Sequence, residues 1–335
     1  MPISPAPVVA LGTDGPLSDA WNAVRSGAIR SAAADLLRLS QRTADGTVSL
    51  SAEEQSLAAA LQVETRLAVG DLAGASAAGD LLAAMVAPRA EAGCQVATNV
   101  HLGLGQLSEA LGDHAAALHH FLAAGEAGGS DLLRPWRSGA AVALIRTGRR
   151  REGADLAREQ VDLTSVTDDA HAHAVGLRAL AITGADTRPV DVLRRAQIVA
   201  ATTSDRRLQA QIHTDLAALM LLSLAGDRTE AVALLRLAET YAGAEGLWPL
   251  HTRVSRLLEH AGEQPRSLED ETLSLLTPAE QRVARLAAGG LTNRQIADRL
   301  LVTIKGVEWH LSRVYRKLGI ASRGDLVGLI STRAS

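Results

Sequence analysis

The side chains with the clearest chemistry lie near the C-terminus, where residues 304–318 carry basic and polar groups at a helical spacing. On a helix that turns by about 100° per residue, one face is basic and polar and the other is apolar. The basic face holds Lys305, Trp309, Ser312, Arg313 and Arg316, and the apolar face holds Val307, Leu311, Val314 and Leu318. Because guanidinium and ammonium groups bind phosphate oxygens, this face predicts contacts with the backbone of a nucleic acid.

Three side chains of the same segment are candidates for reading base edges in the major groove of DNA. They are Glu308, Trp309 and Ser312, and a glutamate there can accept a hydrogen bond from cytosine N4. Two alternatives stay open: Trp309 packs against the N-terminal repeat domain in a closed form, or Arg316 and Lys317 form an ordinary solvated surface. His310 is expected to make a structural hydrogen bond.

Helix-capping signals predict the elements that position these side chains. Residues 277–280 (TPAE) form an N-cap, a proline at the first helical position and a capping-box glutamate. Residues 292–295 (TNRQ) repeat the capping box, residues 301–302 make a turn, and Thr303 begins the next helix. Two short helices, a tight turn and a longer helix predict a helix-turn-helix.

Over residues 276–280 (LTPAE), 290–297 (GLTNRQIA) and 307–320 (VEWHLSRVYRKLGI), the C-terminal segment resembles the LuxR-type helix-turn-helix. The resemblance implies four helices, with residues 304–318 as the recognition helix. Helix N-termini and basic side chains are expected to bind the DNA backbone. These contacts are expected from Thr292, Asn293, Arg294, Thr303, Lys305, Arg313, Arg316 and Lys317.

The resemblance also implies a fourth helix, capped by Ser322, that forms a dimer contact on DNA. The dimer contact is expected from Leu326, Leu329 and Ile330, and RNA polymerase is a further expected partner. One residue departs from the family, which usually has threonine where this chain has Gly306. Glycine costs about 1 kcal/mol relative to alanine in a helix and lacks the hydroxyl group, so a reduced DNA affinity is expected.

The charge of the chain is distributed unevenly. From Leu276 onward there are ten Arg and Lys and four Asp and Glu, so this segment has a net charge of +6. The residues before Leu276 have a net charge of −9, and the whole chain has a net charge of −3. A basic segment attached to an acidic body is typical of a module that binds a polyanion. Lysine occurs only at Lys305 and Lys317, which excludes a Gly-Lys-Ser/Thr phosphate-binding loop.

The histidines and the single cysteine, Cys94, predict no catalytic or metal site. Two groups of histidines lack Cys or carboxylate partners at the spacing of a zinc site, so they are expected to be solvated or capping residues. They are His114, His119 and His120, and His171 and His173. Cys94 lies in a helical pattern as a buried thiol without an intrachain disulfide partner. We expect no enzymatic activity, cofactor or metal.

The N-terminal part of the chain repeats a helical pattern. Glycine closes an apolar-periodic segment at intervals of 36 to 43 residues, at Gly27, Gly70, Gly112, Gly148, Gly184, Gly226 and Gly262. A small residue that permits close helix packing follows five positions later, at Ala32, Ala75, Ala117, Gly153, Pro189 and Ala231. Residues 112–124 (GDHAAALHHFLAA) resemble the second helix of a tetratricopeptide repeat (TPR). This spacing predicts a TPR-like α-solenoid, with an irregular helical bundle as the alternative.

The expected protein is therefore all-α. A TPR-like repeat domain occupies residues 1–263, a polar linker interrupted by Pro265 occupies 264–273, and the C-terminal head, a four-helix LuxR-type domain, occupies 274–335. The sequence contains no run of about eighteen apolar residues and no basic secretion signal, so we expect a cytoplasmic protein without a membrane span.

The repeats resemble, more loosely, the C-terminal half of the large ATP-binding regulators of the LAL or MalT-like group. This sequence has no counterpart of their nucleotide-binding domain, so ATP switching is not expected. The leading hypothesis is a sequence-specific DNA-binding transcription regulator whose repeats bind an unknown small-molecule or protein effector. The alternative is a protein-interaction scaffold with a weak or vestigial DNA-binding head. An aromatic-poor, lysine-free N-terminal region does not fit a response-regulator receiver or an acyl-lactone sensor.

Overall fold

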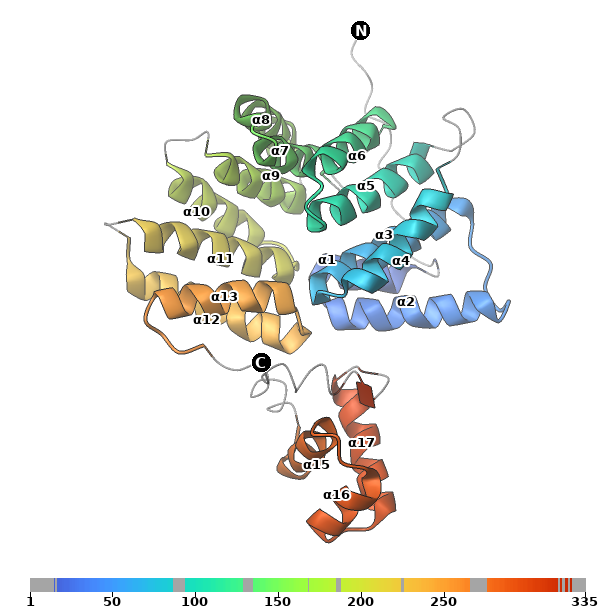
Figure 1. Cartoon of the computed structure of the whole chain (residues 1–335). Coiled ribbons are helices and arrows are strands. Elements are labelled where there is room, and N and C mark those ends of the chain that lie inside the picture. The colour runs from blue at the N-terminus through green and yellow to red at the C-terminus, as the bar shows by residue number, and fades with distance from the viewer. Residues whose placement is uncertain are drawn as a thin grey trace. The chain divides into compact units, whose positions relative to one another are not determined.

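The computed structural model of the chain describes residues 15, 17–86, 94–128, 135–167, 169–184, 188–223, 226–265, 276–318, 320, 323–324 and 326. Within these ranges all regular secondary structure is α-helical, which confirms the predicted fold class (Figure 1). The chain divides into two compact units, Met1–Ile212 and His213–Ser335. The division falls inside one helix, α11 (Arg206–Leu222).

The first unit holds ten helices and the beginning of α11 among its described residues. They are α1 (Ser18–Ser26), α2 (Ile29–Ala44), α3 (Ala52–Val69), α4 (Leu72–Ala84), α5 (Cys94–Ala110), α6 (His114–Glu126), α7 (Trp136–Arg146), α8 (Arg150–Ser165), α9 (Ala170–Thr183) and α10 (Pro189–Ala200). The second unit holds the rest of α11, and then α12 (Arg228–Glu245), α13 (Trp248–His260), α15 (Pro278–Ala288), α16 (Asn293–Leu300) and α17 (Ile304–Leu318).

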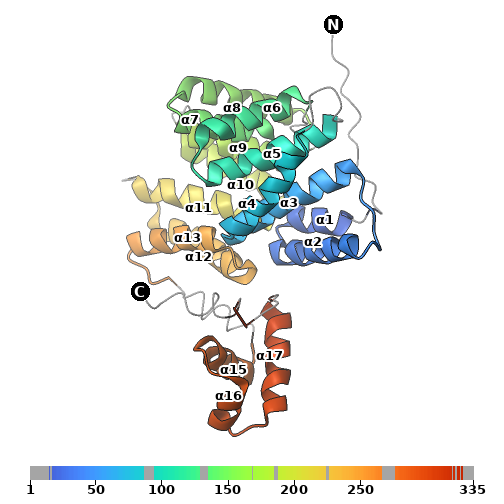
Figure 2. The ribbon, with the colours of Figure 1, turned by 45° about the vertical axis from the view of Figure 1, so that its right-hand side comes forward.

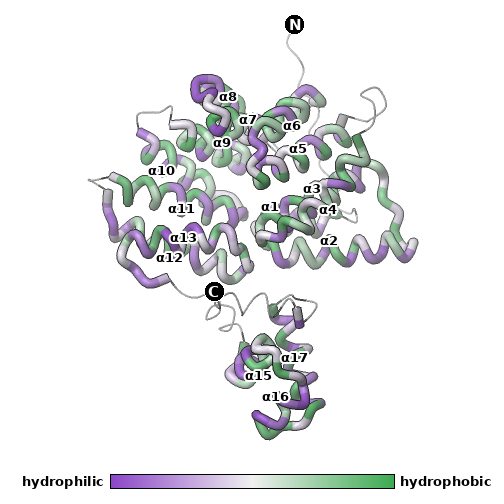
Figure 3. The backbone as a smooth tube through the Cα atoms, in the orientation of Figure 1, coloured by the Kyte–Doolittle hydropathy of each residue, from purple (hydrophilic) through white to green (hydrophobic). Residues whose placement is uncertain are grey.

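In the first unit, consecutive helices form antiparallel pairs that pack on their neighbours (Figure 2). Helix α3 contacts α4 and α5, α5 contacts α6 and α7, and α7 contacts α8 and α9. The interfaces are built on small residues, since the side chains of Ala60, Ala75 and Ala117 are completely buried. Apolar and polar residues alternate along these helices (Figure 3), as in helices with one covered side. This neighbour-to-neighbour packing fits a TPR-like solenoid, although the repeat family itself stays a prediction.

Glycine ends the first helix of most pairs, as predicted. Six of the seven glycines have φ between 63° and 84°, the left-handed conformation that favours glycine after a helix. Gly226 differs from these six in its surroundings, because a Cβ atom added there would overlap the carbonyl oxygen of Met220.

The predicted small residues at the start of the second helices are confirmed at five of six positions. Ala32, Ala75, Ala117 and Ala231 are completely buried, and Gly153 is buried too. Pro189 differs, because it is only half-buried and forms the first residue of α10. A proline there has the φ of a helix start, and its nitrogen needs no hydrogen-bond acceptor, so it begins α10.

In the second unit, α12 packs on α13. Asp227 caps α12 by accepting a hydrogen bond from the backbone N–H of Glu230 at 3.1 Å. The buried carboxylate of Glu239 pairs with Arg236 at 2.9 Å. No helix among those that the structure describes has the length and apolar composition needed to cross a membrane.

Candidate nucleic-acid interface

Reciprocal caps begin the first two helices of the head. The Thr277 hydroxyl accepts from the backbone N–H of Glu280, and the Glu280 carboxylate accepts from the backbone N–H of Thr277 at 2.8 Å. Thr292 and Gln295 form the same capping box at the start of α16. Both predicted capping boxes are confirmed. A typical N-cap is worth about 1 kcal/mol.

The turn between α16 and α17 uses a non-glycine residue with a left-handed backbone. Leu301 has φ of 54° and is 93% exposed, and its N–H bonds back to Ala297. Thr303 then caps α17, as predicted, by accepting from the N–H of Gly306 at 3.1 Å. The turn is therefore closed by backbone bonds on one side and by a hydroxyl cap on the other.

The apolar face of α17 forms part of a core of its own. The predicted stripe of Val307, Leu311, Val314 and Leu318 is buried, as are Ile296 of α16 and Val283 of α15. Complete burial of one such side chain stabilises a fold by roughly 1.5–3 kcal/mol. The core fixes which face of α17 is exposed.

The opposite face of α17 is exposed and basic. Trp309 is 54% exposed, and Lys305, Glu308, Ser312 and Arg316 are exposed as well. The Arg313 guanidinium lies 4.6 Å from the centre of the Trp309 ring, a cation–π contact. The His310 and Trp309 rings pack edge to face. The Nδ1 atom of His310 is buried and has no hydrogen-bond partner among the described residues, so the expected structural hydrogen bond is not seen at this atom.

A buried carboxylate that the sequence analysis treated only as a cap joins α15 to α17. Glu280 is 2% exposed, and its Oε2 lies 2.6 Å from Lys317 Nζ while its Oε1 lies 3.2 Å from Arg313 Nε. The hydrogen bond from Lys317 lowers the pKa of Glu280 from 4.5 to about 2, against the opposing effect of burial. Arg313 and Lys317 are thus held against the head, whereas Arg316 extends away from this cluster on the exposed face.

Spacing along the helix is the signal that could have revealed this cluster. Arg313 and Lys317 are four residues apart, and side chains at that spacing lie on the same side of a helix. Two cations on one side, next to a glutamate that is already fixed by its cap, form a site for one shared carboxylate.

At the start of α16 the predicted backbone-binding residues are differently placed. Thr292 and Arg294 are exposed, while Asn293 is half-buried and accepts a hydrogen bond from Arg323 Nη1 at 3.0 Å. Arg323 also bonds the backbone oxygen of Leu291. Arg323, which the sequence analysis did not single out, therefore ties the chain after α17 to the start of α16.

Gly306 lies in the first turn of α17. A Cβ atom added at this position would lie 3.3 Å from the Thr303 hydroxyl oxygen, and outside the adjoining backbone of α17 no other atom of the described residues lies within 4 Å of it. The helix can accept a side chain here if Thr303 shifts by a few tenths of an ångström. Glycine is therefore not required by the backbone of α17.

The predicted dimer residues are only partly described. Leu326 is completely buried within the core of the head, so its prediction as a dimer contact was wrong: its apolar side chain is used in packing against the other helices. Leu329, Ile330 and the predicted cap Ser322 lie outside the described residues. The side chain of Cys94 and most of the predicted linker also lie outside them.

The capping boxes, the tight turn and the two-sided third helix define the C-terminal helices as a helix-turn-helix domain. Residues 274–330 match the model of the bacterial regulatory proteins of the luxR family, also called GerE. The C-terminal part of the chain is therefore a LuxR-family helix-turn-helix domain, as the motifs predicted.

Similar proteins agree with this assignment over the same segment. A Mycobacterium bovis protein named as an HTH-type transcriptional regulator is 50% identical over 60 residues, which cover 18% of this chain and 7% of that protein. The Fimbriae Z protein of Escherichia coli K12 is 34% identical over 73 residues, which cover 22% of this chain and 35% of that protein. The HTH-type transcriptional regulator AlkS of Alcanivorax borkumensis is 32% identical over 65 residues, which cover 19% of this chain and 7% of that protein. The chain thus spans about a third or less of the length of these relatives.

Proposed function

We propose that the protein is a sequence-specific DNA-binding transcription regulator and that α17 enters the major groove. The observation that carries this proposal is the exposed face of α17, where Trp309, Glu308 and Ser312 stand among basic side chains on a helix whose other face is fully packed. Lys305 and Arg316 would contact phosphates, together with Thr292, Arg294 and Thr303. Arg313 and Lys317 would add to the positive potential while paired with Glu280.

The remaining parts of the proposal concern control. The head of residues 274–335 follows a repeat domain of 1–263 and a linker of 264–273, and binding of an effector to the repeats would alter the activity of the head. The protein would act as a homodimer on DNA and would contact RNA polymerase. Since Leu326 is buried, a dimer contact would have to use Leu329, Ile330 or other surface residues.

A salt titration tests the proposal. In gel shifts with double-stranded genomic fragments, log K should fall linearly with log salt concentration, by about 0.9 for each phosphate contact. Four or more contacts would give a slope steeper than about −3.6. An affinity that barely changes between low and high salt would exclude the proposed interface.

A second candidate function is a protein-interaction scaffold with a weak DNA-binding head. The pairing of Arg313 and Lys317 with Glu280 favours it, because two predicted phosphate ligands are held within the protein. The absence of a side chain at Gly306 also favours this candidate, because it removes a hydroxyl that could contact a phosphate. Ordinary affinity for a selected DNA site, together with loss of regulation when residues 276–335 are deleted, would eliminate this candidate.

A further inference from the structure

Two exposed apolar side chains stand at the N-terminal end of α17. Leu301, in the turn before the helix, is almost completely exposed, and Ile304, the first residue of α17, is 45% exposed. Among the described residues, neither belongs to the core of the head or to the apolar side chains packed against that core. Burial therefore does not explain why these two side chains are apolar.

The turn itself does not require a leucine at position 301. Leu301 is the one non-glycine residue with a positive φ in the part of the chain that the structure describes. A Cβ atom strains this conformation, and glycine and asparagine adopt it more readily. The backbone of the turn is held by hydrogen bonds to the carbonyl oxygen of Ala297, including one from the N–H of Val302 at 3.0 Å. The side chain of Leu301 is thus available for a contact outside the chain.

Val302, a third exposed apolar residue of the turn, has a structural explanation. It directly precedes Thr303, the cap of α17. An apolar residue before a cap commonly packs against the fourth residue of the helix, which here is the buried Val307. Leu301 and Ile304 have no such position in the capping motif.

Ile304 lies on the basic and polar face of α17. It precedes Glu308 by four residues, so the two side chains lie on one side of the helix, one turn apart. Lys305, the next residue, is exposed as well. In a helix-turn-helix, the N-terminal residues of the recognition helix contact base edges in the major groove. Ile304 thus stands where the helix would first meet the bases.

The chemistry of the major groove identifies the group that these side chains would contact. The base edges there present hydrogen-bond donors and acceptors, and thymine adds an apolar group, its C5-methyl. We propose that Ile304 contacts the methyl group of one thymine in the bound DNA and that Leu301 contacts the methyl group of another. The inference rests on the proposed function, since it assigns two further residues to sequence recognition.

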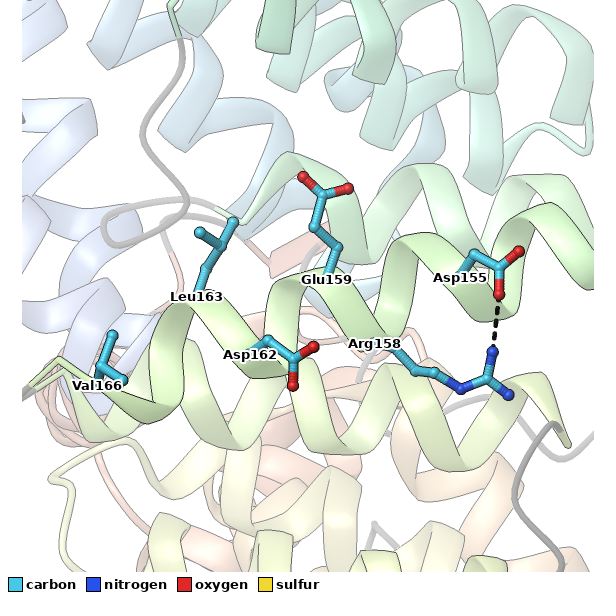
Figure 4. Close-up of a pocket in the computed structure, with 6 residues that line it drawn as sticks. All are labelled: Asp155, Arg158, Glu159, Asp162, Leu163 and Val166. Carbon is cyan, nitrogen blue, oxygen red and sulfur yellow. Dashed lines mark hydrogen bonds and ion pairs between the residues drawn. The ribbon is translucent and has the colours of Figure 1, made fainter. Parts of the chain in front are cut away.

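Size and charge favour DNA over a protein partner at this end of α17. Two aliphatic side chains are far smaller than the roughly 800 Å² that each partner buries in a stable protein–protein interface. Lys305 beside them attracts phosphates. On α8, by contrast, the exposed Leu163 and Val166 lie beside the carboxylates of Glu159 and Asp162, a setting that repels DNA (Figure 4).

Replacement of single thymines by deoxyuridine tests the inference, because deoxyuridine lacks only the C5-methyl group. The duplex is one that the full chain selects from genomic fragments, and affinities are measured by gel shift at one salt concentration. At one or two thymines the replacement should weaken binding by about fourfold, the value for one buried methyl group. The proposal is wrong if no thymine of the selected duplex responds to the loss of its methyl group.

Two variants assign the contacts to the two side chains. Ile304→Ala should make binding insensitive to deoxyuridine at one of these thymines, and it should keep the fold, since alanine is the better helix former. Leu301→Asn, which suits the left-handed turn, should have the same effect at the other thymine. Leu163→Ala is the matched control, because Leu163 is also 45% exposed, and it should keep the affinity and the full sensitivity of the wild type.

The outcomes separate this inference from the proposed function. Full sensitivity to deoxyuridine in both head variants would overturn the inference, and unchanged affinity in both would leave the two side chains to a protein partner or a second copy of the chain. A uniform loss of affinity with preserved sensitivity would show that the residues act only on the fold of the head. A preferred duplex without any response to deoxyuridine contradicts this inference alone, whereas a chain without any preferred duplex contradicts the proposed function and this inference with it.

Discussion

At the scale of single residues, Glu280 joins the start of α15 to α17. One buried carboxylate caps α15, binds Lys317 at 2.6 Å and lies 3.2 Å from Arg313, which in turn stacks on Trp309. The orientation of the exposed tryptophan thus depends on a glutamate that does not face the solvent. Glu280 positions groups of the interface without belonging to its surface.

Replacement of Glu280 by glutamine should destabilise the head in a pH-dependent manner. The pKa of Glu280 is lowered from 4.5 to about 2, so its stabilising effect is present above about pH 4.5 and is lost as the pH falls through 4.5 towards 2. The shift corresponds to about 3 kcal/mol at pH 7. Urea unfolding of the full chain, followed by amide resonances of residues 276–318, measures the difference. Equal stability of Glu280→Gln and wild type at pH 7 would contradict the account.

Gly306 provides a second test at this scale. Gly306→Thr should raise DNA affinity by about three- to tenfold, because the hydroxyl can bond a phosphate and a side chain lowers the cost of helix formation by up to about 1 kcal/mol. Gly306→Ala is the control, since it lacks the hydroxyl and gives a larger helical gain than threonine, so a higher affinity of Gly306→Thr would have to come from the hydroxyl. Affinities of the two variants in the same gel shift should differ, with no change in salt slope. Identical affinities would show that the hydroxyl is not used.

At the scale of elements, α17 divides its cations into two groups. Arg316 is exposed, whereas Arg313 and Lys317 are drawn towards Glu280. Exposed cations release counterions when they meet phosphates, and a cation already paired with a carboxylate contributes less. The two neighbouring residues Arg316 and Lys317 should therefore behave differently on DNA.

Arg316→Gln should weaken binding to all DNA sequences and reduce the salt slope by about 0.9. Lys317→Gln should change the slope by less than half of that amount, and its main effect should be on stability through the loss of the partner of Glu280. Salt titrations of both variants on the same duplex measure the contrast. A larger slope change for Lys317→Gln would show that the Glu280 pair opens on DNA.

Local signals explain which elements could be predicted from the sequence. The capping boxes at Thr277 and Thr292 and the apolar stripe of α17 depend on residues within one or two turns, and all were predictable. The Glu280–Lys317 contact was not predicted, because it joins two helices across 37 positions. The ion pair between Arg207 of α11 and Glu64 of α3 joins positions that are more distant still. Pro189 was misjudged because a fixed spacing after a glycine cannot distinguish a helix start from a packing position.

At the scale of the whole molecule, the sequence combines an acidic part with a basic head. The residues before Leu276 carry a net charge of −9 and the head carries +6. Like charges repel, so the acidic part would be disfavoured near DNA while the head is attracted to it.

The ion pair between Glu64 and Arg207 should couple the start and the end of the first unit. A double-mutant cycle with Glu64→Gln and Arg207→Gln should give a coupling energy of about 1 kcal/mol, since both side chains are largely buried. The exposed pair Asp155 and Arg158 is the control, and such surface pairs give only about 0.3 kcal/mol. Urea unfolding of the full chain measures both cycles. Equal coupling in the two pairs would contradict the prediction that burial strengthens the Glu64–Arg207 pair.

The central claim is that the exposed face of α17 recognises a DNA sequence. The most direct measurement is the ratio of affinities of the full chain for a duplex selected from genomic fragments and for a scrambled duplex of the same composition, at one salt concentration. The predicted ratio is about 1,000 or more, and it should fall sharply in a Glu308→Ala, Trp309→Ala double variant. A ratio near one for the wild-type chain would contradict the account.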